Sequence, residues 1–135
     1  MAIVKMINEI YSYDSGERYD RYDGYEVVTD QCTYRVLISN YQSCCESWGF
    51  MVVNDDVDSF VGKALKEVRM TDTALNTRKI EEEVGDLDYG GIEFVDFVFD
   101  DGDILQIAVY NGHNGCYGHD IKLMMDDTVI HNGCL

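Results

Sequence analysis

The feature that most constrains the fold is a pair of apolar runs that flank a short acidic turn. Residues 92–99 and 103–110 are both rich in β-branched and aromatic side chains, and Asp100, Asp101 and Gly102 lie between them. Aspartate followed by glycine between two such runs is one of the stronger local signals for a β-hairpin. The chain is therefore predicted to contain an antiparallel sheet.

Further strands are predicted at 25–29 and 34–38, where the sequence period is two. Other candidate strands are 64–70, which alternates again, and the short segments 48–53, 121–125 and 128–130. Residues 55–62 are expected to form no more than one helical turn, and 71–91 a long excursion without an apolar period. Residues 1–24 have no sustained apolar face and are expected to form an arm or a short helix. These expectations give a mostly β or α+β fold, an antiparallel sheet, half barrel or small sandwich of six or seven strands.

Size and charge limit what such a domain binds. The chain has 135 residues, 46% of them hydrophobic, with 26 acidic against 10 basic residues and a formal net charge of −16. One domain with an arm at 1–24 and a core at 25–135 fits this length. The charge argues against direct binding to nucleic acid or to anionic membranes, which basic residues mediate. The sequence shows no apolar run of membrane-spanning length and no signal-peptide pattern, so a cytosolic location is expected.

The carboxylates are unevenly distributed. From Ile80 through Ile121 the chain has eleven acidic residues and no lysine or arginine. A run of this kind is usually a solvated face, and it also suits a surface that attracts a basic partner. The candidate binding residues in this run are Glu81, Glu82, Glu83, Asp86 and Asp88.

Residues 110–119, YNGHNGCYGH, combine three glycines with asparagine, histidine, cysteine and tyrosine. One interpretation is a tight loop in which glycine and asparagine adopt positive φ angles. The other is a binding loop in which Asn111, His113, Asn114 and His119 face a partner or an ion.

Metal binding is a separate hypothesis for the cysteines. Five cysteines in a chain without secretion signals favour reduced thiols or metal ligands over disulfides. Cys44 and Cys45 are either small buried residues or, with His113, Cys116 and His119, ligands of a structural zinc ion. No established catalytic signature accompanies these residues, so enzymatic activity is not the expectation.

Two motifs resemble those of small uncharacterised domains encoded by bacteriophages and prophages of Gram-positive bacteria. The first is a CCE-containing segment at 44–49, and the second is an N-x-x-NG-x-YG loop at 111–118. The residues at 60–65 resemble the segment that links these motifs. The resemblance covers about residues 25–125 and implies a phage origin and an antiparallel β-rich fold.

These observations lead to three functional hypotheses. The first is a phage counter-defence protein that docks on a basic, nucleic-acid-handling host protein, such as a CRISPR effector, and blocks it. The second is a sponge for a nucleotide immune signal, with Arg35 or Arg69 beside the glycine-rich loop. The third is a metal-dependent hydrolase centred on Glu46, His113, His119 and a cysteine. Both a monomer and a homodimer remain open.

Overall fold

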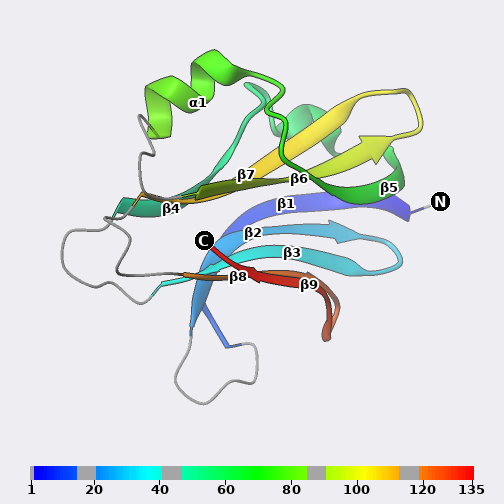
Figure 1. The fold of residues 1–135 in the computed structure, drawn as a ribbon. Coiled ribbons are helices and arrows are strands. Elements are labelled where there is room, and N and C mark those ends of the chain that lie inside the picture. The colour runs from blue at the N-terminus through cyan, green and yellow to red at the C-terminus, as the bar shows by residue number, and fades with distance from the viewer. Residues whose placement is uncertain (1, 15–20, 41–46, 85–90, 113–118) are drawn as a thin grey trace.

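The computed structural model describes residues 2–14, 21–40, 47–84, 91–112 and 119–135, and it is mostly antiparallel sheet (Figure 1). The strands follow one another in the order β4-β7-β6-β5-β1-β2-β3-β8-β9. Their bounds are β1 Ala2–Tyr13, β2 Tyr22–Thr29, β3 Thr33–Ser39, β4 Ser47–Val52, β5 Ala64–Thr71, β6 Gly91–Phe99, β7 Ile104–Gly112, β8 Asp120–Met125 and β9 Thr128–Cys134. The predicted mostly β fold is confirmed, with nine strands in this sheet rather than six or seven.

The sheet folds over into two layers at the junction of β1 and β5, which pair only through Ala2–Leu65 and Ile3–Ala64. Strands β4, β7, β6 and β5 form the upper layer of Figure 1. Strands β1, β2, β3, β8 and β9 form the lower layer. The strands of the two layers cross. Within β4, Trp48 stacks on His119 beside β8, whereas Phe50 contacts Tyr25 of β2.

The core lies between these crossed layers. Phe97, Leu105 and Ile107 of the upper layer are fully buried against Val27 and Ile38 of the lower layer. Because side chains alternate along a strand, the hairpin of β6 and β7 also presents apolar residues to its outer face. A second, smaller cluster forms there around Phe94 and Ala108.

The expectation of an arm or short helix at residues 1–24 was wrong. Residues 2–13 form β1, which pairs along β2, and β2 begins at Tyr22 rather than at residue 25. A register shift between Val4 and Met6 interrupts the alternation, so that Val4 and Ile7 both pack into the core. This β-bulge hides the period of two from a reading of the sequence.

The segment at 71–91 contains a helix that the sequence analysis missed. Helix α1, Thr77–Val84, covers the outer face of the upper layer (Figure 1). Only Ile80 and Val84 of this helix pack against the sheet, which is too few to give a recognisable apolar period. The single helical turn expected at 55–62 is present as η1, Asp58–Phe60. Within the described ranges, no helix is long and apolar enough to cross a membrane.

Gly24 permits the close approach of β2 and β3 in the lower layer. A Cβ atom at this position would overlap the carbonyl oxygen of Val36 and lie 2.9 Å from its carbonyl carbon. Since both atoms belong to the main chain, no side-chain rotation relieves the overlap.

Replacing Gly24 by alanine should therefore lower the free energy of unfolding by about 2 kcal/mol or more, measured by urea denaturation. The matched control is Gly133→Ala, because a Cβ there meets Ile121 at an ordinary 3.5 Å. The control should stay within about 1 kcal/mol of the parent. Equal stability of the two variants would contradict the close approach.

Candidate functional site

The structure brings together the strand ends that border the two sequence motifs. Ser47 of β4 pairs with Gly112 of β7, and the His119 Nδ1 atom lies 2.6 Å from the Ser39 carbonyl oxygen at the end of β3. The described residues that flank 41–46 and 113–118 therefore lie at the same end of the sandwich. Of the predicted site residues, Cys44, Cys45, Asp86, Asp88, His113, Asn114 and Cys116, and also Glu46, lie outside the described residues.

The two predicted site residues that can be described near this end have structural contacts. His119 is buried, stacks on Trp48 and donates from Nδ1 to the carbonyl of Ser39, since a carbonyl only accepts. Asn111 is fully buried, and its amide nitrogen donates to the carbonyl of Leu135 at 3.1 Å. Among the described residues, no group of three histidine, cysteine or acidic side chains could hold a metal ion.

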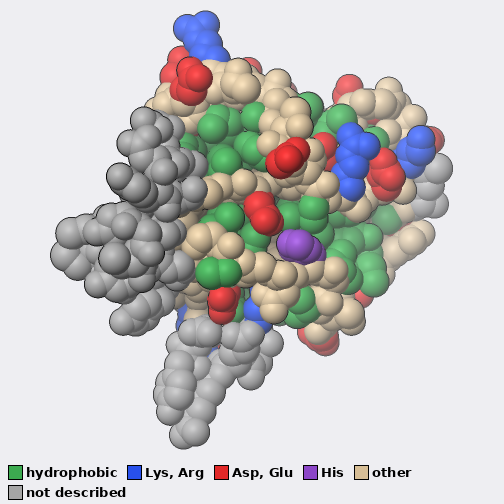
Figure 2. All heavy atoms as spheres, viewed as in Figure 1, with side chains coloured by type: hydrophobic (Ala, Val, Ile, Leu, Met, Phe, Trp, Pro, Cys, Tyr) green, Lys and Arg blue, Asp and Glu red, His purple; other side chains and the backbone are tan. Residues whose placement is uncertain are grey.

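The predicted acidic residues Glu81, Glu82 and Glu83 lie on α1, and all three are exposed. Ile80 and Val84 of α1, both partly buried, pack against the sheet, which leaves the carboxylates in solvent. Figure 2 shows acidic side chains scattered over one face of the molecule between patches of apolar side chains. Glu81, Glu82 and Glu83, which we call the acidic surface, are therefore presented by a helix that is packed against the sheet.

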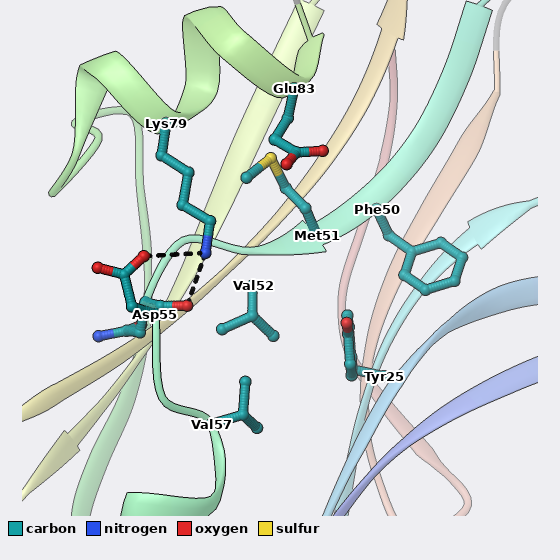
Figure 3. A pocket seen from close by; sticks show the side chains of 9 residues that line it. Tyr25, Phe50, Met51, Val52, Asp55, Val57, Lys79 and Glu83 are labelled. Atoms are coloured by element: carbon teal, nitrogen blue, oxygen red, sulfur yellow. Dashed lines mark hydrogen bonds and ion pairs between the residues drawn. The ribbon is translucent and has the colours of Figure 1, made fainter.

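A groove runs along β4 between α1 and the lower layer (Figure 3). Its volume is about 330 Å³. We call it the β4 groove, and it is lined by Tyr25, Phe50, Met51, Val52, Asn54, Asp55, Val57, Lys79 and Glu83. Lys79, Glu83 and Met51 form one wall, and Tyr25, Phe50 and Val57 form the other.

The β4 groove follows a sheet edge, because β4 is the terminal strand on this side of the sheet. The N–H of Val53 donates to the carbonyl of Gln106 on β7 at 2.9 Å. This bond shows which residues of β4 turn their main-chain groups toward β7. Residues of an antiparallel strand alternately turn their main-chain groups toward and away from the neighbour. The N–H and C=O groups of Met51 therefore point toward β7, whereas those of Phe50 and Val52 point toward the groove. In the described part of the chain, no hydrogen bond reaches these groups.

Aromatic rings and a carboxylate border the lower wall of the groove. Phe50 contacts Tyr25 at a centroid distance of 5.4 Å and Tyr11 at 5.8 Å. The hydroxyls of Tyr11 and Tyr25 both donate to Glu9, at 2.7 and 3.2 Å. Burial, followed by the charge of Glu9, raises the pKa of Tyr25 to about 12. The phenol thus stays protonated and keeps donating well above neutral pH.

A network of buried polar groups holds the upper wall in place. Gln106 on β7 is fully buried, and its amide nitrogen donates to Asp96 at 2.8 Å and to the carbonyl of Thr73 at 3.0 Å. Its amide oxygen accepts from the N–H of Leu75 at 2.9 Å. These bonds attach the segment that leads into α1 to the sheet. We call this network the Gln106 clamp.

Asn54 connects the Gln106 clamp to the groove. Its side chain accepts from the N–H of Gln106 and donates to the carbonyl of Ile104, both at 2.8 Å. Its carbonyl accepts from the Lys79 ammonium at 2.8 Å, and Asp55 lies 3.6 Å from the same ammonium. The charge of Lys79 is thereby largely satisfied within the protein.

The arrangement suits the binding of a cationic, extended ligand. Lys79 is the only basic residue among the groove-lining residues, which also include Asp55 and Glu83, and Glu9 adds a third carboxylate at the rim. Aromatic faces and carboxylates both attract lysine and arginine side chains. The run of carboxylates in the sequence indicated Glu83, whereas no sequence signal indicated Tyr25, Phe50 or the edge of β4 as parts of a site. Asn76 was an available signal for α1, because its side chain caps the helix by accepting from the N–H of Lys79 at 3.1 Å.

Substituting Gln106 with leucine keeps a similar volume but leaves Asp96 and the main chain of Thr73 and Leu75 without these hydrogen bonds. The free energy of unfolding should fall by about 2–4 kcal/mol, because unsatisfied buried groups are costly. Gln31→Leu is the control, since Gln31 is exposed in a turn and should tolerate the same change. Urea denaturation of both variants measures the difference, and a stable Gln106→Leu protein would contradict the clamp.

Stability should fall as the pH rises from about 10 to about 12, because folded Tyr25 retains a proton that the unfolded chain releases. Tyr25→Phe removes this proton and should flatten the decline. Burial likewise raises the pKa of Tyr34 to about 12, so Tyr34→Phe should flatten it separately. Urea denaturation at a series of alkaline pH values measures the slope. A decline in Tyr25→Phe as steep as in the parent would contradict the assignment.

A comparison with protein families identifies one match. The model of the family described as "Domain of unknown function (DUF7448)" matches residues 1–123. No curated protein and no solved structure matches the chain significantly. The match extends through the strands that carry the β4 groove and the Gln106 clamp. The chain therefore belongs to the DUF7448 family.

Proposed function

We propose that this chain is a protein-binding domain that docks through its acidic surface on a basic, nucleic-acid-handling partner. The observation that carries the proposal is the exposure of Glu81, Glu82 and Glu83 on a helix whose other side is packed against the sheet. A fixed array of carboxylates is complementary to the basic surfaces that bind phosphates. The formal net charge of −16 adds long-range attraction to such a surface.

The specific form of the proposal is a phage counter-defence protein that acts in the bacterial cytosol on a CRISPR effector. Effectors of the Cas9 type hold their guide–target duplex in a positively charged channel. An acidic domain that occupies this channel, or a neighbouring basic surface, blocks the nucleic acid. The sequence motifs at 44–49 and 111–118 support the phage origin.

The described residues give less support to the two other hypotheses. Arg35 of β3 is paired with Glu26 of β2, and Arg69 of β5 is paired with Asp96 of β6 and with Glu67, so either candidate arginine already has a carboxylate partner. The β4 groove is bordered by carboxylates, which repel a nucleotide. For a hydrolase, His119 is the one described member of the expected metal set, and its Nδ1 atom is engaged by Ser39.

The proposal predicts electrostatic binding to a purified Cas9-type effector that carries its guide RNA. Equilibrium titrations at low and at physiological salt should show much weaker binding at the higher salt. Replacing Glu81, Glu82 and Glu83 together by glutamine should weaken binding about tenfold, since each exposed ion pair contributes modestly.

The control for this triple variant is Asp100→Asn, Asp120→Asn and Asp127→Asn combined, which removes the same charge from exposed positions outside α1. The control should retain most of the affinity. Absence of binding at low salt would overturn the effector hypothesis. Equal losses in both triple variants would show that net charge, and not α1, determines binding.

A further inference from the structure

We infer that the β4 groove binds an extended, basic segment of the partner, which adds to the sheet as a strand beside β4. This inference rests on the proposed function and specifies how the partner is held. Strand addition uses main-chain hydrogen bonds for affinity and alternate side chains for specificity. The β4 groove offers both components in one place.

The main-chain component is the open edge of β4. Phe50 and Val52 turn their N–H and C=O groups toward the groove, as the bond from Val53 to Gln106 establishes. Proteins usually protect such an edge, because it is a template for pairing with another chain. Here a groove of about 330 Å³ adjoins the edge.

The side-chain component favours arginine or lysine on the lower wall. Tyr25 and Phe50 present aromatic surface there, and Glu9 accepts hydrogen bonds from the hydroxyls of Tyr25 and Tyr11. Tyr11 is 62% exposed, which extends the aromatic surface beyond the groove. A cationic side chain on these rings gains cation–π attraction and lies near a carboxylate.

The two ends of the upper wall favour the same charge. Glu83 comes from α1, and Asp55 follows β4, with its side chain 90% exposed. The positive charge of Lys79 repels a cationic ligand only weakly, because its ammonium is already bonded to Asn54 and paired with Asp55. Successive side chains of a strand point to opposite faces, so a residue next to a basic one on the lower wall faces Met51, between Glu83 and Asp55, and is expected to be apolar at that position.

The test uses a short synthetic peptide of alternating arginine and valine, titrated into the intact protein by calorimetry. The peptide should bind, and the same peptide with glutamate in place of arginine should not. Two further peptides carry N-methyl groups on either the valines or the arginines. Strand addition requires that one of the two methylated peptides lose binding, because one set of N–H groups faces β4. Binding that survives both methylations would overturn strand addition.

A pair of protein variants tests the location. Glu83→Gln combined with Asp55→Asn removes the two lining carboxylates and should weaken the peptide about tenfold. Asp56→Asn combined with Asp58→Asn removes the same charge from exposed neighbours that do not line the groove and should have an effect below about twofold. Equal losses in the two variants would overturn the assignment to the groove.

The peptide titration and the effector titration together separate this inference from the proposed function. An effector that still binds in a salt-dependent way, while the peptide does not bind, would refute the groove and leave acidic docking intact. If neither the effector nor the peptide binds at low salt, both proposals fail.

Discussion

The arrangement around β4 depends on the burial of one uncharged polar side chain, Gln106. This residue lies near the start of β7 and is fully buried, so its amide needs hydrogen-bond partners within the protein. The partners are Asp96, Thr73 and Leu75, which come from the neighbouring strand and from the segment before α1. Satisfying this amide therefore fixes where the helix lies on the sheet.

The position of α1 determines what the edge of β4 can bind. The helix supplies Lys79 and Glu83 to one wall, and the crossed packing of the two layers brings Tyr25 against Phe50 on the other. The Lys79 ammonium is bonded to Asn54 and paired with Asp55, so Glu83 leaves the groove with a net negative charge. The strand edge, the aromatic wall and the carboxylates together favour an extended cationic ligand over an anionic one.

Local signals predicted the hairpin of β6 and β7 well, because its two apolar runs and its Asp-Gly turn agree with each other. The sequence did not reveal β1, whose bulge after Val4 breaks the alternation, or α1, which packs only Ile80 and Val84, both partly buried, against the sheet. Of the candidate site, Glu83 was found through the run of carboxylates. Tyr25 and Phe50 looked like ordinary strand residues, since their role depends on which strand is at the edge and on how the layers cross. These are long-range properties that local pattern does not encode.

The most direct test of this account is residue-resolved amide hydrogen exchange in the free protein, read by NMR spectroscopy along β4. Slow exchange is expected at Met51 and Val53, whose N–H groups are bonded to β7, and much faster exchange at Phe50 and Val52. This alternation would establish that the edge is open and available to a ligand. Equal protection at all four amides would contradict it, because a second neighbour would then already occupy the edge of β4.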